Sequence, residues 1–227
     1  MQRLRLKFGR GAPVRFISHL DSVRCWERVF RRASIPLEYT QGFTPHPRIA
    51  VAAPLAVGVT SDAELLDIWL RKWVPPQSAL MMARNQLPDG FTLLDVWEVP
   101  NGAPALQAMV HTARYECIAV HEAGLEEAQR AAAAFMQTES VVHHFSRGGE
   151  EREVDLRPLV HGITVGAGPG DSCRVDLEVR IGQEGSARPD HVLSELGFVE
   201  PAIAIHRAAL SFEQPGADTS EDSPRPR

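Results

Sequence analysis

The sequence predicts an α+β fold made of two tandem ferredoxin-like (βαββαβ) repeats with antiparallel sheets. Stretches of alternating apolar and polar residues, typical of strands, are separated by stretches with apolar residues every three or four positions, typical of helices. The order strand, helix, two strands, helix, strand occurs in residues 1–100 and again in residues 113–213. A linker of small residues, 101–112, joins the repeats, and the polar tail 214–227 is expected to be disordered.

In the first repeat, residues 3–8 (RLRLKF) alternate basic and apolar side chains, which predicts a strand whose basic residues face outward. Apolar residues then recur from Leu20 at helical spacing, directly after Ser18 and Asp21, which are spaced as a helix cap. This helix should end before Pro36. Further strands are expected over 48–54, 64–70 and 91–99, with a second helix over 75–88.

The second repeat contains two motifs that combine arginine with aspartate. Asp155 and Arg157 in EVDLRP would share one face of a strand, and Arg188 and Asp190 in RPDHV would begin a helix. Each pair either fixes a turn or faces the first repeat and contacts an anion there. The residues alone leave both interpretations open. The expected strands are 114–121, 141–145, 153–165, 173–181 and 203–212, and the expected helices are 125–137 and 188–196.

The first helix has an arginine-rich side. The apolar stripe is expected to bury Trp26 and Phe30 in the core, which leaves the opposite side to solvent. Four arginines lie on that side: Arg24, Arg28, Arg31 and Arg32. Because guanidinium groups bind phosphate and carboxylate in a bidentate manner, this side predicts a site for a polyanion.

The segment that follows, YTQGFTPHPRI, has the composition of a stiff exposed loop. Gly42 permits unusual backbone angles, and Pro45 and Pro47 restrict the backbone on both sides of His46. The loop would therefore hold several hydrogen-bonding groups in fixed positions beside the arginines. These groups belong to Tyr39, Gln41, His46 and Arg48.

The charge of the chain is unevenly distributed. The net charge is -5, but residues 1–50 carry ten Lys or Arg against three acids, a net of +7. The acidic remainder argues against a nonspecific nucleic-acid binder, and we expect no DNA partner. The three cysteines lie far apart in sequence, so we expect no metal site and no cofactor. The sequence has neither a membrane-span pattern nor a leader pattern, which predicts a cytoplasmic protein.

Five motifs, in this order, resemble one known family: FISHLD, ERVFRRA, YTQGFTPHPRI, EVDLRP and RPDHVLSEL. They are similar to the radical-SAM-associated domain of uncharacterised function, which occurs in bacteria beside or fused to a radical SAM protein of the B12-binding type. The resemblance runs from about Arg3 to about Glu213. It implies a stand-alone family member that acts with a radical SAM partner, in a setting of RNA metabolism, and it carries no settled activity.

Three functions follow from these observations. We expect a non-catalytic adaptor that binds RNA, such as tRNA or rRNA, or another phosphate-rich substrate for a radical SAM partner, because a sheet with basic and aromatic groups often carries RNA. A second hypothesis is a metal-independent endoribonuclease or RNA-modifying enzyme that uses His19 or His46 as general acid or base. A third is a structural subunit whose arginines meet an acidic protein partner.

Overall fold

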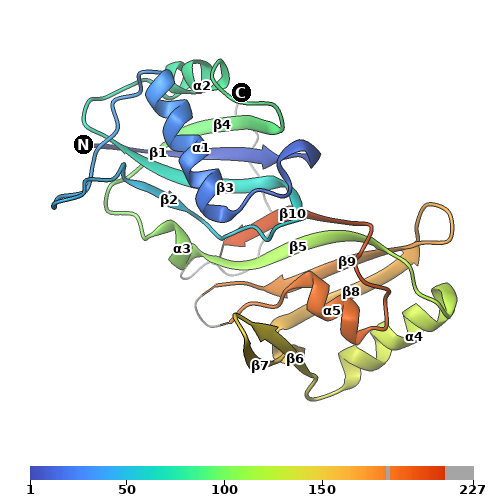
Figure 1. Ribbon diagram of the computed structural model, residues 1–227. Coiled ribbons are helices and arrows are strands. Elements are labelled where there is room, and N and C mark those ends of the chain that lie inside the picture. Colours follow the sequence, from blue (N-terminus) through green and yellow to red (C-terminus); the bar gives the residue numbers. More distant parts are fainter. Residues whose placement is uncertain (183–184, 213–227) are drawn as a thin grey trace, which may run out of the picture.

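The computed structural model describes residues 1–182 and 185–212, with every side chain in these ranges except that of Arg147. The first half of the chain forms β1 (Gln2–Arg10), α1 (His19–Arg32), β2 (Ile49–Val51), β3 (Thr60–Leu70), α2 (Pro76–Arg84) and β4 (Phe91–Val99) (Figure 1). The second half forms α3 (Leu106–Met109), β5 (Val110–Ala119), α4 (Gly124–Gln137), β6 (Val142–Arg147), β7 (Glu150–Asp155), β8 (Val160–Ala167), β9 (Cys173–Arg180), α5 (Pro189–Glu195) and β10 (Ala204–Phe212). The predicted α+β class is therefore confirmed.

Eight strands form one sheet that includes both halves of the chain. Its order is β4-β1-β3-β10-β5-β9-β8. Strand β2 lies off this path and pairs with residues 66–68 of β3. All pairs are antiparallel except β3 and β10, which run parallel and pair at Thr60 with His206 and at Ser61 with Arg207. We call this junction the seam. It is the place where the strands of the two halves meet.

Helix α1 begins and ends as the sequence predicts. The Ser18 hydroxyl accepts a hydrogen bond from the backbone N–H of Asp21 at 3.1 Å, which confirms the cap. Trp26 and Phe30 are buried, and the Trp26 ring centroid lies 4.9 Å from that of Phe8 on β1 and 5.4 Å from that of Phe30. The expectation that Leu20 belongs to the buried stripe is wrong: its side chain is 65% exposed, because it lies on the side of the helix that carries Arg24.

Arg3 and Arg5 of β1 are buried, which corrects the expectation that the basic residues of this strand face outward, whereas Lys7 is exposed as expected. Arg3 and Arg5 both donate to the carboxylate of Asp67 on β3, at 2.6 Å and 2.8 Å for the closest contacts. Arg3 also donates to the carbonyl of Ala103, at 2.8 Å. The segment between the halves thus covers the part of this face that carries Arg3 and Arg5, so these two charges need a buried counter-ion.

That segment, expected to be a linker, is built into the fold. It contains α3 and the first residues of β5, and Leu106 is fully buried. Leu106 belongs to the hydrophobic cluster of the second half, together with Leu55 and Leu65 of the first half. The halves therefore share part of one core.

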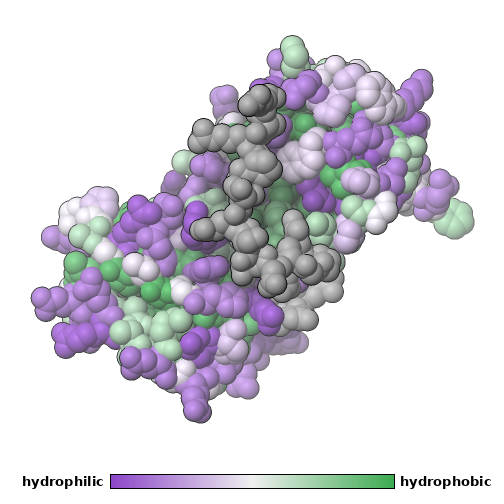
Figure 2. Space-filling view, turned by 180° about the vertical axis from the view of Figure 1, so that it is seen from behind, coloured by the Kyte–Doolittle hydropathy of each residue, from purple (hydrophilic) through white to green (hydrophobic). Residues whose placement is uncertain are grey.

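Two further expectations for the second half fail, and one lies outside the described residues. Residues 153–165 do not form one strand, because β6 and β7 make a separate hairpin and β8 joins the large sheet. Asp155 ends β7 and Arg157 begins a 3₁₀ turn, so the two residues do not alternate on one strand face. The expected disordered tail, 214–227, falls outside the described part of the chain. Seen from behind, both halves carry many hydrophilic residues, with hydrophobic residues visible between them (Figure 2).

Candidate functional site

The arginine flank of α1, which we define as Arg24, Arg28, Arg31 and Arg32, is exposed as predicted. Arg24 lies 3.3 Å from Asp21, but the two side chains are 65% and 57% exposed, so this ion pair is weak. Arg28, Arg31 and Arg32 form no ion pair with any residue that the structure describes. The flank therefore offers unneutralised guanidinium groups to an anion.

The loop after α1 is exposed, and short cross-contacts hold its two sides together. The backbone N–H of Thr40 donates to the carbonyl of His46 at 2.8 Å, and the N–H of His46 donates back to the Thr40 hydroxyl at 3.0 Å. Tyr39 pairs with Pro47 in a β-bridge. Gln41, Gly42 and Pro45 are exposed, with Gly42 at φ 132°, a conformation that favours glycine.

Arg48, at the end of this loop, is engaged inside the first half. Its guanidinium carbon lies 4.8 Å from the ring centroid of Trp69, and that of Arg3 lies 5.2 Å from the same ring. The guanidinium groups of Arg3 and Arg48 therefore both lie against the Trp69 ring, whose quadrupole attracts cations. Arg48 is only partly available to a ligand, in contrast to the arginine flank.

The two candidate catalytic histidines are far apart. His19 begins α1, where burial lowers its pKa, the nearby Arg10 lowers it further and Glu64 on β3 opposes the shift. His46 lies in the exposed loop, which follows the segment paired with Leu70 at the other end of β3. The strand between Glu64 and Leu70 spans roughly 20 Å. His19 and His46 therefore cannot act on the same bond.

The aspartate and arginine motifs of the second half make intramolecular contacts. Asp155 accepts hydrogen bonds from the backbone N–H groups of Val141 and Arg157, at 2.9 Å and 3.1 Å. The Arg157 guanidinium donates to the carbonyls of Val160 and Met136, both at 3.0 Å. This geometry favours the interpretation that the pair fixes a turn.

Arg188 occupies a different kind of position. Its Nε donates to a carboxylate oxygen of Asp190 at 3.0 Å, and about half of its side chain is exposed. It also lines two cavities that lie between the halves of the chain. Arg188, together with its partner Asp190, therefore lies at this cleft.

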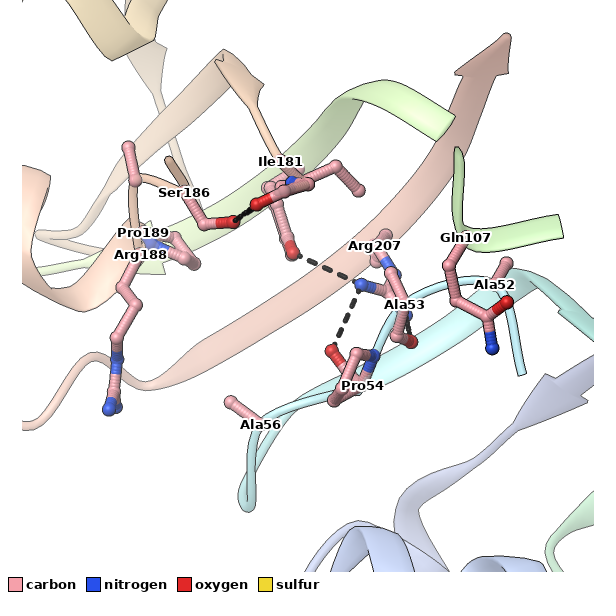
Figure 3. Close-up of a pocket in the computed structure, with 13 residues that line it drawn as sticks. Ala52, Ala53, Pro54, Ala56, Gln107, Ile181, Ser186, Arg188, Pro189 and Arg207 are labelled. Atoms are coloured by element: carbon pink, nitrogen blue, oxygen red, sulfur yellow. Dashed lines mark hydrogen bonds between the residues drawn. The ribbon is translucent and has the colours of Figure 1, made fainter. Parts of the chain in front are cut away.

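The first cavity lies over the seam and has a volume of about 270 Å³ (Figure 3). Residues 52–56 and 181–189 form its walls, and Tyr115 of β5 and Arg207 of β10 line it from the sheet. The Arg207 guanidinium donates to the Glu64 carboxylate at 2.8 Å and to the carbonyl of Ala53 at 3.1 Å. We call this the seam cavity.

The charge of Arg207 is balanced by its own surroundings. Burial lowers its pKa, but the Glu64 carboxylate and the Tyr115 hydroxyl more than offset burial, so the pKa of Arg207 lies above its usual range. Because Glu64 neutralises it, Arg207 stabilises the junction of the halves and gives the seam cavity little attraction for an anion.

The second cavity adjoins the first, and both are lined by Ala56 and Arg188. Its volume is about 410 Å³, and its walls come from residues 15–16 and 56–59 of the first half and from parts of 188–205 of the second. We call it the rim cavity. Arg15 and Phe16 in its wall lie just before the start of α1, the helix that carries the arginine flank.

Sequence reasoning missed both cavities and the charged residues at the seam. Glu64 and Asp67 occur in the run ELLDIWL, where apolar residues surround two acids. Acids within an apolar strand need partners, so this run was a signal for buried ion pairs. Phe16 gave a weaker signal, because one aromatic residue before a helix is more often part of the core.

The described residues include no group of three or more His, Cys, Asp or Glu placed to hold a metal ion. Cys117 and Cys173 are buried and Cys25 is partly buried, all as free thiols. Burial raises the pKa of the Cys117 thiol to about 12. Within the same described ranges, no helix is long and apolar enough to cross a membrane.

The structure is that of an α+β protein with a basic face on helix α1 and a cleft between its two halves. The sequence matches one family over residues 3–189, described as an uncharacterized protein conserved in bacteria (DUF2344). The chain belongs to this family. The description gives no activity and no link to radical SAM proteins, and no curated protein matches the sequence.

Two solved structures match this chain at low similarity. One is a chain of a Cbf5-Nop10-Gar1 complex, with a TM-score of 0.48 and 10% sequence identity, covering 94% of this chain and 48% of that one. The other is a chain of an H/ACA RNP bound to a substrate RNA containing 2'-deoxyuridine, with a TM-score of 0.45, 10% identity, and coverage of 93% and 47%. The chain spans about half the length of these proteins.

Proposed function

We propose that this protein is a non-catalytic RNA-binding adaptor and that the arginine flank of α1 contacts the phosphates of the RNA. The observation that carries the proposal is the exposure of four arginines on one side of one helix, three of them without an ion pair to any described residue. Guanidinium groups in such a row can each contact a phosphate of one strand. A radical SAM partner, which the family resemblance implied, stays a prediction.

We also infer that the two halves are ferredoxin-like repeats. The first half runs β1, α1, β2, β3, α2, β4, and its sheet has the order β4-β1-β3-β2. The second half gives the same succession with β5, α4, β8, β9, α5 and β10, if the hairpin of β6 and β7 is counted as an insertion, and its order is β10-β5-β9-β8. This correspondence supports a tandem architecture, with domain limits near those expected from the sequence.

The charge that can reach RNA is smaller than the sequence suggested. Of the ten basic residues in positions 1–50, Arg3, Arg5 and Arg10 are buried. Arg10 donates to the carbonyls of Val14 and Ile17, and burial lowers its pKa. RNA binding by the first half must therefore depend on the surface residues, chiefly the arginine flank.

The test is the salt dependence of single-stranded RNA binding, followed by fluorescence anisotropy. Each phosphate contact contributes roughly -0.7 to the slope of log affinity against log salt for single strands, so three contacts contribute about -2. Replacing Arg24, Arg28 and Arg31 together with Gln should remove this contribution. The fold should be unaffected, because these side chains lie off the buried stripe.

A matched control replaces Arg114, Arg130 and Arg152 with Gln, which removes the same charge from exposed positions of the second half. The control should keep the slope of the wild-type protein. If both triple variants bind RNA equally well and with the same slope, the proposal is wrong, and the arginine flank belongs to an acidic protein partner. Cleavage of RNA in EDTA by the wild-type protein, lost on replacing His19 or His46, would favour the enzyme hypothesis instead.

A further inference from the structure

The wall of the rim cavity includes several exposed hydrophobic side chains. Four large hydrophobic side chains that line it remain in contact with solvent: Phe16 is 68% exposed, Val57 58%, Val199 41% and Ile203 65%. Two come from the first half and two from the second, so they are far apart in sequence and are brought together by the fold. A contiguous exposed apolar surface of this kind marks a binding site more often than scattered single residues do.

Phe16, the aromatic residue of this wall, lies against the positively charged side chain of Arg15. The Arg15 guanidinium carbon lies 4.6 Å from the ring centroid of Phe16. Arg15 has no ion pair with a residue in the described ranges, and it is exposed. A positive group next to an accessible aromatic ring suits a ligand that combines a flat ring with an anionic group.

The backbone holds both residues in place. The backbone N–H of Gly58 donates to the carbonyl of Arg15 at 2.8 Å. The Arg10 guanidinium donates to the carbonyls of Val14 and Ile17, which flank Arg15 and Phe16 in the chain. A Cβ on Gly58 would lie 4.0 Å from the Phe16 ring, and Gly58 has φ +89°. The ring therefore lies beside the 56–59 turn at a residue whose backbone favours glycine, and the backbone that carries Phe16 is held by these hydrogen bonds.

The remaining charges of the rim decide where an anionic group can lie. Arg188 is neutralised by Asp190 through the hydrogen bond at 3.0 Å. Glu200 is exposed at the cavity wall and has no ion pair with the described residues. An anion is thus repelled from the Glu200 side and attracted to Arg15, which gives the cavity a polarity.

We infer that the rim cavity binds one unstacked nucleotide of single-stranded RNA, with the base against Phe16 and its apolar neighbours and the phosphate at Arg15. This inference rests on the proposed function. It identifies the rim cavity as the place where an RNA strand bound to the arginine flank continues beyond the start of α1. The volume of about 410 Å³ is that of a small-ligand site, since such pockets measure roughly 300 to 1,000 Å³. Proteins that read single-stranded RNA hold unstacked bases on aromatic rings and arginine planes in this way.

The position along the chain supports the same path. Phe16 lies two residues before the cap Ser18, and α1 continues from there to the arginine flank. Leu20, 65% exposed on the first turn, lies on the same side of the helix as Arg24. A strand that follows the arginine flank towards the start of α1 therefore meets an apolar and aromatic surface at the rim cavity.

The direct test is methyl NMR of the full chain, titrated with AMP and separately with UMP. A base stacked in the cavity should shift the methyl signals of Val57, Val199 and Ile203 through its ring current. The methyl signals of Val142, on β6 and outside both cavities, should stay unchanged. Replacing Phe16 with Ala should abolish the shifts, and because Phe16 is exposed the fold should remain intact.

The second measurement is the affinity for a single-stranded RNA dodecamer. Loss of one base–aromatic stack corresponds to roughly a 5- to 100-fold decrease, which we expect for Phe16→Ala. The matched control, Trp73→Ala, removes an aromatic side chain that is 66% exposed elsewhere on the first half and should leave the affinity unchanged.

The outcomes separate this inference from the proposed function. If AMP shifts the cavity methyls and Phe16→Ala weakens RNA binding while the arginine-flank variant binds RNA like the wild type, the cavity assignment holds and the proposed role of the arginine flank is wrong. If RNA binding depends on the arginine flank, but neither nucleotide shifts the methyls and Phe16→Ala binds RNA normally, the inference is overturned. The apolar wall would then be assigned to a protein partner.

Discussion

The ion pair at the seam gives the sharpest test of how the two halves are held together. Glu64 and Arg207 are 2% and 1% exposed, and they join β3 to β10 where the strands pair in parallel. In Glu64→Gln, one amide oxygen can still accept from the Arg207 Nε, but the amide NH₂ replaces the other oxygen and faces a guanidinium N–H. The positive charge then keeps only neutral acceptors: that amide oxygen, and the carbonyls of Ala53 and Pro54 and the Tyr115 hydroxyl at 3.1 to 3.4 Å.

Breaking a buried ion pair by removing one partner costs about 3 to 5 kcal/mol, because the other charge stays buried without compensation. In a chain of this size, each kcal/mol lowers the melting temperature by roughly 2 to 4 °C, so Glu64→Gln should lower it by about 6 to 20 °C. Urea unfolding at neutral pH, followed by circular dichroism, measures the free energy directly.

A matched control exists on the same strand. Asp62 lies 3.5 Å from His206 across the seam, but its side chain is 79% exposed. Asp62→Asn should change the free energy of unfolding by less than about 1 kcal/mol, as is usual for exposed ion pairs. If Glu64→Gln is no less stable than Asp62→Asn, burial does not set the strength of the seam contact and the reasoning fails.

Three further predictions concern α1 and the turn after β7. Ser18→Ala removes the acceptor for the Asp21 N–H and should lower the free energy of unfolding by about 1 kcal/mol in urea. The backbone N–H of Val141, opposed in part by desolvation, holds the pKa of Asp155 below 3.8. The Asp155 carboxylate should therefore stabilise the protein fully above pH 3.8, and this stabilisation should be lost as the pH falls through the lower pKa of the folded state. The urea midpoints of wild type and Asp155→Asn should consequently converge in acid. Burial lowers the pKa of His19 below 6.5, so NMR should show its imidazole titrating below that pH; a pKa above 6.5 would contradict the burial.

The sequence by itself determined the local structure around α1. A serine cap, apolar residues at helical spacing and a proline beyond the end specify a helix from short-range contacts alone, and the structure has α1 at His19–Arg32. The exposure of the arginine flank followed from the same periodicity. The basic charge of the first fifty residues was also evident, although three of its arginines are buried.

Only the tertiary structure decided which strand faces are buried. Alternation in RLRLKF shows that β1 has two different faces, but it cannot show that residues 103–109 cover the basic face and that Asp67 supplies the counter-charge. The partners of Arg3 and Arg207 are distant in sequence, so no local pattern records them. The rim cavity is of the same kind: Phe16 and Ile203 are close only because β3 and β10 pair, and that pairing depends on long-range contacts which the chain makes when both halves fold together.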